Sequence, residues 1–306
     1  MTKKEVVFLG FTKDYHKMEC DSVSDLYNTT IINIPAFFKL FKIFNIFGFN
    51  IKNIFEKKWL YNKLNSFKCP IVLMMDNDRY INIMKGREGL KIILIRDIDN
   101  KVSKSLLDEF SIYSFDSFEC EKLGYKKYKQ YNSGYNYIVN SSFKLKYDFS
   151  FIGRNKGREK YLNDFFISLD GSYKYDKLII EELSYFKSII SSIPFIKQKK
   201  LAYKDYLDRI LSAKCILDIV QDGQTSETMR LTESLLANRK VITNNKRILD
   251  HELYNKNNIL YLREGKNIKN KINEFMESDF ICYDTDIILK YSPRYVLSSI
   301  IESEIQ

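Results

Sequence analysis

The chain has 306 residues, and its 49 Lys and Arg against 39 Asp and Glu give a formal net charge of +10. This length suffices for two domains of about 150 residues, each with its own core, and a hydrophobic content of 45% excludes an intrinsically disordered chain. No apolar run of about 20 residues is present to span a bilayer, and the start, MTKKEVVFLG, predicts a buried strand rather than a signal peptide. We therefore expect a cytoplasmic protein.

The first half of the chain alternates short apolar runs with helical patterns. Continuous apolar strands separated by helices predict a parallel sheet covered on both faces, hence a Rossmann-like, doubly wound α/β domain. The tyrosine-rich stretch Gly124 to Tyr147 is interpreted as the crossing to a second domain. The predicted strands are Glu5 to Leu9, Ile31 to Ile34, Ile71 to Met75, Ile92 to Ile95 and Ile112 to Phe115.

The segment Phe37 to Leu60 combines aromatic residues with lysines. Phe and Ile recur at steps of three and four residues with Lys between them, which predicts a basic, aromatic pair of amphipathic helices. Two interpretations stay open. Either the aromatic face packs in the first domain and the lysines are solvated, or the segment makes peripheral contact with the anionic inner face of the cell membrane, with which the net charge agrees.

The second half repeats the alternation of strands and helices, with its sheet starting near Phe151. We expect one domain over residues 1–145, a second domain over residues 146–290, and a terminal helix over residues 291–306. Strand ends from both α/β sheets would face a cleft, where ligands bind in such folds. The other predicted strands are Lys177 to Ile180, Cys215 to Val220, Lys240 to Thr243 and Ile259 to Leu262, and the predicted helices are Tyr203 to Ala213, Ile268 to Met276 and Pro293 to Ile305.

The cysteines and histidines do not form a metal-binding pattern. The five cysteines are scattered with no CxxC pair, which argues against a structural zinc site and against a secreted disulfide framework. The two histidines, His16 and His251, are far apart in the sequence. We expect no metal and no cofactor, and mostly reduced, buried cysteines, with Cys215 the clearest case.

The most informative stretch runs from Cys215 to Asn245, CILDIVQDGQTSETMRLTESLLANRKVITNN. It predicts a strand, a loop, a helix and a second strand. In a parallel sheet this unit brings a loop and a helix N-terminus to the carboxyl edge, where backbone N–H groups and the helix dipole favour a phosphate. Arg230 and Glu233 are three residues apart and can share a helix face, so that one would meet phosphate and the other a ribose hydroxyl. Alternatively, Arg230 forms an ion pair with Glu227 or Glu233.

A second motif lies upstream, in YDFSFIGRNKGREKYL, from Tyr147 to Leu162. An apolar strand leads to Gly153, and Arg154, Lys156 and Arg158 precede a helical pattern. Cations and free N–H groups therefore converge at one strand end. On its own, the basic turn is as well explained by simple exposure.

Together the two motifs resemble the nucleotide-sugar-binding half of GT-B glycosyltransferases, in particular bacterial enzymes of lipopolysaccharide and capsule biosynthesis. The resemblance covers residues 147 to 265. It implies metal-independent binding of a nucleotide-sugar donor by residues 146–290, with Glu233 on the ribose. It also implies that residues 1–145 bind the acceptor and that the terminal helix packs back on this first domain. A pair of glutamates spaced by seven is common in retaining members, but the first would fall on Ser226 and Glu227 is out of step, so the retaining or inverting outcome stays open. The implied donor-binding residues are Gly153, Arg154, Lys156, Gly223, Gln224, Thr225, Thr228, Arg230 and Glu233.

The predicted function is transfer of a sugar from a nucleotide-sugar to a hydroxyl of a bacterial surface glycan: a lipooligosaccharide, O-antigen or capsule, free or lipid-linked. Such transfer requires neutralisation of the leaving diphosphate and often a base that activates the acceptor. The first candidate base is Asp76, which ends the strand IVLMM, followed by Asp116 and His16. Aspartates at strand ends also serve as helix caps.

Two other classes of protein remain as alternatives. A nucleotide-binding α/β protein without transferase activity would carry the same motifs. A nucleic-acid-binding protein would explain the positive charge, but the basic residues are spread along the chain, with no zinc-finger spacing, RNP-type motif or basic tail. We therefore expect no nucleic-acid partner.

Overall fold

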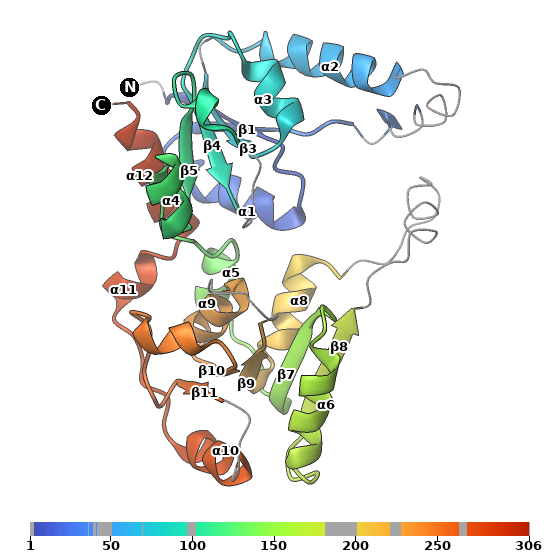
Figure 1. Cartoon of the computed structure of the whole chain (residues 1–306), viewed down its shortest axis with the longest axis vertical. Coiled ribbons are helices and arrows are strands. Elements are labelled where there is room, and N and C mark those ends of the chain that lie inside the picture. Colours follow the sequence, from blue (N-terminus) through green and yellow to red (C-terminus); the bar gives the residue numbers. More distant parts are fainter. Residues whose placement is uncertain are drawn as a thin grey trace. The chain divides into compact units, whose positions relative to one another are not determined.

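The computed structural model describes residues 3–35, 37–38, 41, 51–68, 70–96, 102–180, 201–220, 228–262 and 268–305. By its contacts the described chain divides into two units, residues 3–133 with 293–305, and residues 134–180 with 201–292. Each unit contains one parallel sheet with helices against it (Figure 1). The predicted fold class, two Rossmann-like doubly wound α/β units, is confirmed.

The sheet of the first unit has six described strands in the order β2-β1-β3-β4-β5-β6, and all neighbouring strands are parallel. β1 and β3 pair directly, with Leu9 beside Met74, so the strand order reverses at this point. The strands are β1 (Glu5–Leu9), β2 (Asn28–Ile32), β3 (Ile71–Met75), β4 (Lys91–Ile95), β5 (Ser111–Ser114) and β6 (Lys126–Lys127).

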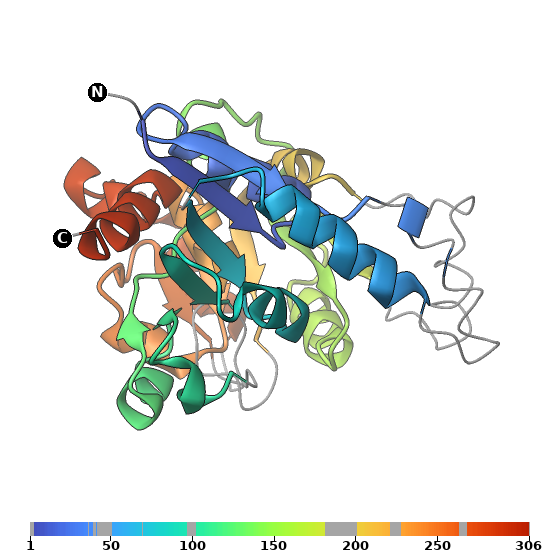
Figure 2. The same ribbon diagram turned by 90° about the horizontal axis from the view of Figure 1, so that it is seen from above.

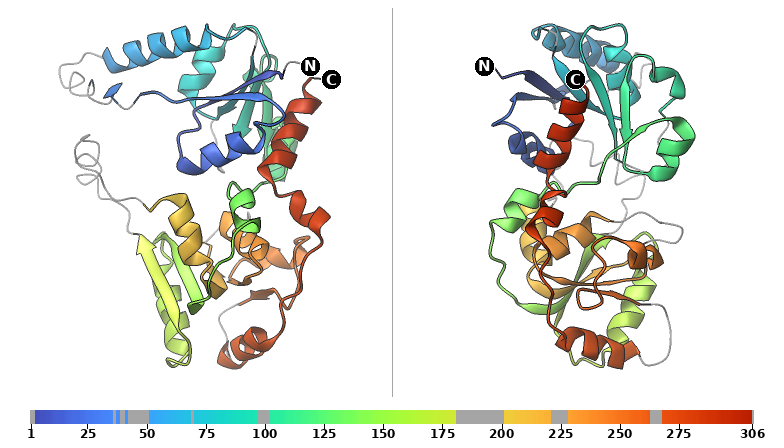
Figure 3. Two further views of the ribbon diagram at one scale, coloured as in Figure 1. Left: turned by 180° about the vertical axis from the view of Figure 1, so that it is seen from behind. Right: turned by 90° about the vertical axis from the view of Figure 1, so that its left-hand side faces the viewer.

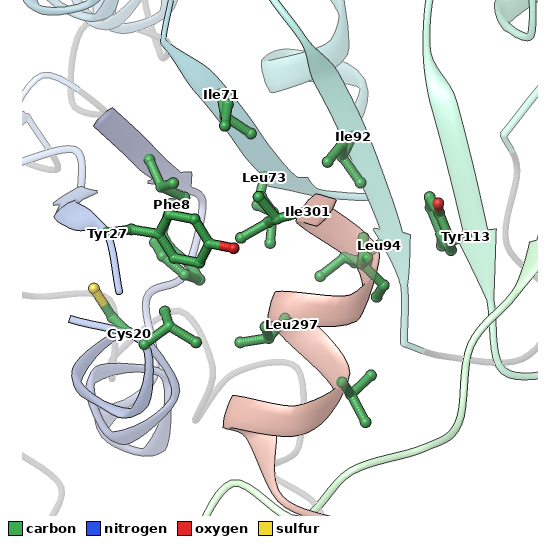
Figure 4. Packing of buried hydrophobic residues seen from close by; sticks show 14 of the residues in the cluster. Phe8, Cys20, Tyr27, Ile71, Leu73, Ile92, Leu94, Tyr113, Leu297 and Ile301 are labelled. Carbon is green, nitrogen blue, oxygen red and sulfur yellow. The ribbon is translucent and has the colours of Figure 1, made fainter. Parts of the chain in front are cut away.

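Both faces of this sheet are apolar because helices cover both. Phe8 and Leu73 face α1 and α12, in a cluster that includes Leu297 and Ile301 of α12 (Figure 4). The alternate residues, such as Val7, pack with α2 and α3 on the other face (Figure 2). The helices are α1 (Asp14–Ser22), α2 (Ile51–Leu64), α3 (Asp78–Met84), α4 (Ser117–Leu123) and α12 (Pro293–Ser303), with a 3₁₀ turn, η2, at Lys104–Leu106.

The last helix, α12, belongs to the first unit although the chain reaches it only after the second (Figure 3). Just beyond its end, the Glu304 carboxylate accepts hydrogen bonds from Tyr113 (2.5 Å), Lys126 (2.6 Å) and Ser111 (2.7 Å). Apolar packing and these polar contacts together fix the helix against β5 and β6.

The sheet of the second unit has five described strands in the order β11-β10-β9-β7-β8, again all parallel. β7 pairs with β8 on one side and with β9 on the other, so the strand order reverses between β7 and β9. The strands are β7 (Tyr147–Arg154), β8 (Tyr175–Ile180), β9 (Ala213–Asp218), β10 (Lys240–Thr243) and β11 (Ile259–Tyr261).

Helices also cover both faces of this sheet. Phe149 and Leu217 pack with α6 and α10, whereas Ile152 and Ile216 pack with α5 and α8. Leu231 of α9 packs on β10 and β11. The helices are α5 (Tyr135–Val139), α6 (Glu159–Ser168), α8 (Tyr203–Ile210), α9 (Met229–Leu236), α10 (Ile268–Glu277) and α11 (Thr285–Leu289), with a 3₁₀ segment, η3, at Lys246–Asp250.

Three predicted strands, β1, β3 and β10, are confirmed at both ends. The predicted strand from Ile31 starts three residues earlier, at Asn28, and stops at Ile32. The helix predicted from Tyr203 to Ala213 ends at Ile210, because Ala213 already begins β9. Cys215 is buried as expected, but Cys282 is exposed. Within the described ranges, none of the helices combines the length and the apolar character that crossing a bilayer requires.

Candidate anion-binding site

The candidate site lies at the carboxyl edge of the second sheet, where β7 and β9 are neighbours. Reversal of strand order separates the connections that leave these two strands, and open α/β sheets bind ligands at such points. Gly153 and Arg154 end β7, and Asp218 ends β9. The helices that follow, α6 and α9, both begin at this edge.

Asp218 holds the first turn of α9 and its arginine in place. Its Oδ1 accepts a hydrogen bond from the Thr228 hydroxyl (2.6 Å) and an ion-pair contact from Arg230 Nη1 (3.3 Å). The same Thr228 hydroxyl caps α9 by accepting from the backbone N–H of Leu231 (3.2 Å). Arg230 therefore pairs with Asp218, whereas Glu227, one of the two partners that the alternative prediction gave it, lies outside the described residues.

The guanidinium of Arg230 lies over the end of β7. Its Nη2 donates to the carbonyl of Ile152 (3.1 Å), and its centre is 4.8 Å from the ring centroid of Phe151. A Cβ atom at residue 153 would lie 2.7 Å from Nη2. Gly153 is therefore needed for the close approach of this side chain, and the sequence prediction of Gly153 as a site residue gains a specific physical reason.

Arg158, just before α6, is the second cation of the site and is buried. It is 9% exposed, and it is close enough to Arg230 and Asp218 for their charges to act on it. Burial and the like charge of Arg230 both lower the pKa of Arg158. Of the three cations in the β7–α6 turn, the fold buries this one, whereas the predicted Arg154 and Lys156 are exposed.

The buried Arg158 and the half-buried Arg230 each have one hydrogen-bond donor that no described residue accepts. The Nε atoms of Arg158 and Arg230 are inaccessible to solvent and have no hydrogen-bond partner among the described residues. Buried donors are normally satisfied, because an unmade hydrogen bond is costly. Two guanidinium groups also face a single carboxylate, that of Asp218. Burial raises the pKa of Asp218, and the neighbouring Arg230 and Thr228 partly offset this by lowering it. The arrangement has the donors and the charge to accept an anion such as a phosphate.

Glu233, predicted to bind a ribose, is 2% exposed and is held by two tyrosines of α8. Tyr203 donates to Oε1 (2.6 Å) and Tyr206 to Oε2 (2.8 Å), and the two phenol rings stack at 5.8 Å. Burial raises the pKa of Glu233, and the tyrosine hydroxyls act in the opposite direction.

Other predicted donor-site residues lie outside the described part of the chain. These are Gly223, Gln224 and Thr225. Their proposed contacts with a phosphate stay a prediction.

The three candidate bases belong to the first unit and differ in their surroundings. Asp76 is half-buried just after β3, beside the point where β1 and β3 are neighbours. Asp116 caps α4 by accepting from the backbone N–H of Glu119 (2.9 Å). This is the helix-cap role that the sequence left open as an alternative.

His16 is buried in α1, with 3% of its surface exposed. Its Nδ1 accepts a hydrogen bond from the backbone N–H of Lys13 (3.0 Å), and its ring contacts Phe11 and Tyr15. Burial, then the charges of Arg96 and Lys13, lower the pKa of His16 to about 3. Such a group is a weak base at neutral pH, which leaves Asp76 as the best placed of the three.

The sequence analysis missed Asp218 and gave Arg158 too little weight. A visible signal existed for Asp218, because a carboxylate inside the apolar run CILDIV must find a cation or lose its charge. No local signal distinguishes Arg158 from Arg154 and Lys156, since burial depends on the path of the turn. That turn needs positive φ at Lys156 (43°) and Gly157 (79°).

Metal ligands do not gather in the described part of the chain, where no three His, Cys, Asp or Glu side chains form a group that would hold a metal ion.

No protein-family model matches the chain, and no curated protein matches its sequence. Solved structures do match over nearly the whole chain. A UDP-N-acetylglucosamine 2-epimerase from Rickettsia bellii is 13% identical, with a TM-score of 0.55, over 100% of this chain and 96% of that one. MnaA of S. aureus, solved with UDP, is 8% identical, with a TM-score of 0.53, over 97% of this chain and 95% of that one. A UDP-GlcNAc 2-epimerase from Methanocaldococcus jannaschii is 12% identical, with a TM-score of 0.51, over 99% of each chain. At these identities the likeness establishes the fold, which is of the GT-B type.

Proposed function

We propose that the protein is a glycosyltransferase that moves a sugar from a nucleotide-sugar donor to a hydroxyl of a bacterial surface glycan. The observation that carries the proposal is the pair of guanidinium groups, of the buried Arg158 and the half-buried Arg230, that act on one carboxylate, Asp218, at the point where the strand order reverses. A leaving nucleoside diphosphate would supply both the acceptor oxygens and the negative charge. The GT-B fold and the resemblance of the Cys215 to Asn245 motif support the same conclusion.

In this mechanism the arginines stabilise charge that develops as the bond from the anomeric carbon to the diphosphate breaks. No metal is required, because two fixed cations take the part of a divalent ion. Thr228 and Asp218 keep Arg230 oriented before the ligand arrives. We assign the donor ribose to Glu233 and the activation of the acceptor hydroxyl to Asp76. The acceptor would be a lipooligosaccharide, O-antigen or capsule chain, reached from the cytoplasmic side of the inner membrane.

A second candidate function is epimerisation of a nucleotide-sugar. The solved structures that match with TM-scores above 0.5 include two named UDP-GlcNAc 2-epimerases, and MnaA is solved with UDP. Both candidate functions use a nucleoside diphosphate site, so the arginines do not distinguish them. An acceptor does, because epimerisation requires none.

Binding is tested first, by ligand-observed NMR with UDP, GDP, ADP and CMP, followed by titration of any nucleotide that binds. We expect a diphosphate to bind and Arg158→Gln to weaken it about 10- to 100-fold, the loss of one or two charge-assisted hydrogen bonds. Arg154→Gln separates the buried arginine from its exposed neighbour and is expected to have a much smaller effect. Arg294→Gln, in the first unit, is the matched control.

Turnover then separates the candidates. The substrates are the nucleotide-sugars of whichever nucleotide binds. A transferase should release free nucleotide only slowly until a glycan acceptor is added, whereas an epimerase should convert the sugar to a second isomer without any acceptor. Absence of nucleotide binding by a folded wild-type protein would overturn both. Equal binding by wild type and Arg158→Gln would overturn the assignment of the site.

A further inference from the structure

Helix α2 carries large apolar side chains that are exposed to solvent as well as those that pack against the first sheet. Leu60 and Leu64 point inward and are buried. Successive residues are rotated by about 100° around a helix, so residues 54, 55, 58 and 61 lie on the outer side. Ile54 is 66% exposed, Tyr61 51% and Phe55 49%. Exposed apolar side chains that lie together on one surface mark a site of interaction with a protein or a membrane.

The same side of α2 is strongly basic. Its one acidic residue, Glu56, is buried and ion-paired with Lys52 (3.1 Å) and Arg79 (3.0 Å). Lys57 and Lys58 are exposed, and no acidic residue of the helix stands three or four positions from either of them. We call Ile54, Phe55, Lys57, Lys58 and Tyr61 the α2 surface.

Aromatic rings extend the apolar region beyond α2. The ring of Phe55 stacks on Phe41, with centroids 5.5 Å apart and planes at 12°. Phe37 is 54% exposed and stacks on the buried Phe38 at 4.4 Å. Part of the aromatic segment thus packs inside the first unit, as one interpretation of the sequence predicted, while Phe37 and Phe55 remain outside.

We propose that the α2 surface docks the protein on an anionic membrane, with Ile54 and Phe55 in the headgroup region and the lysines on lipid phosphates. Apolar side chains flanked by lysines are the pattern of helices that lie in the membrane interface. A nucleic acid would use the lysines but leave Ile54 and Phe55 in water. A symmetric contact with a second copy would oppose Lys57 and Lys58 to themselves. Of these three occupants, only an anionic lipid surface uses both the charge and the exposed apolar residues.

Co-sedimentation with vesicles tests this surface, using phosphatidylcholine alone and phosphatidylcholine with about a third of phosphatidylglycerol. We expect the wild type to bind only the anionic vesicles, and binding to fall as salt is raised. Lys57→Gln with Lys58→Gln is expected to weaken binding about 30-fold, since each lysine near the surface contributes about fivefold. Ile54→Ser with Phe55→Ser is expected to weaken it similarly, without unfolding the protein because both side chains are exposed.

The matched control replaces two exposed lysines of the second unit, Lys160→Gln with Lys271→Gln, and should change binding less than about twofold. Failure of the wild type to bind anionic vesicles, or equal binding by all variants, would overturn the proposal. The proposal would also be overturned if only the lysine variant lost vesicle binding and the wild-type protein bound duplex DNA. Nucleotide binding is measured on the same variants and is expected to be unchanged, so the outcome is independent of the proposed transferase activity.

Discussion

Acid should destabilise the first unit through His16, which the fold keeps neutral. Burial and the nearby Arg96 and Lys13 lower its pKa from 6.5 to about 3. Between these two values the unfolded chain binds a proton on His16 and the folded chain does not. The stabilisation from this residue is therefore complete above pH 6.5 and is lost progressively as the pH falls toward 3.

The size of the effect follows from the pKa difference. Each pH unit below the unfolded pKa costs about 1.4 kcal/mol of unfolding free energy. Between about pH 7.5 and about pH 5, His16 alone should remove about 2 kcal/mol. That is a large share of the stability of a typical domain.

Fluorescence offers a measurement confined to this unit, because the chain has one tryptophan, Trp59, and it packs against the same sheet as α1 does. Urea unfolding followed at Trp59 is compared for wild type and His16→Asn at both pH values. The Asn side-chain oxygen can accept the Lys13 N–H in place of Nδ1 and does not titrate. We expect the wild type to lose about 2 kcal/mol more than the variant on acidification, while the carboxylates and His251 contribute equally to both.

An equal loss in the two proteins would refute the reasoning. So would an NMR titration in which the His16 ring protons shift with a midpoint near neutral pH. Either result would mean that the imidazole is accessible to protons, and His16 would return as a candidate base for the acceptor hydroxyl.

Two further predictions concern the anion-binding site. In Gly153→Ala the added methyl group would meet Nη2 of Arg230 at 2.7 Å. Because the end of the Arg230 side chain can move away, we expect little loss of thermal stability but about tenfold weaker binding of a nucleoside diphosphate. Unchanged affinity would show that Arg230 does not touch the ligand. In Asp218→Asn the two arginines lose their carboxylate, so the ligand-free protein should lose about 3 kcal/mol, whereas a nucleoside diphosphate should raise its melting temperature more than that of the wild type. A destabilised variant with no larger ligand shift would contradict this competition between Asp218 and the ligand.

The sheets were predictable because each central strand is buried on both faces and therefore reads as a continuous apolar run. IVLMM in β3 is an example, and it was predicted at its observed ends. The failures have local causes. β6 consists of two lysines and has no apolar run, and the end of α8 was set too late because Ala213, a good helix former, begins β9 instead.

The residues that complete the candidate site were less predictable because their partners are distant in the sequence. The motif around Arg230 indicated a phosphate, but Arg158 reaches the same place from β7, 72 positions earlier along the chain. Of three cations in that turn, positive φ angles at Lys156 and Gly157 decide which one is buried. A pattern of residue types predicts that a turn is basic; it does not predict which side chain the turn folds inward.

Glu233 shows how such distant contacts bear on function. Each of its carboxylate oxygens already accepts one tyrosine hydroxyl, yet a carboxylate has about four acceptor positions. The tyrosines therefore fix the orientation of Glu233 and leave it able to accept further donors. A ribose offers hydroxyl donors of this kind, so the contacts with Tyr203 and Tyr206 are compatible with the donor role of Glu233. They also add a requirement, because a ribose hydroxyl must approach beside the two stacked phenol rings, and a substitution on α8 should then alter nucleotide affinity.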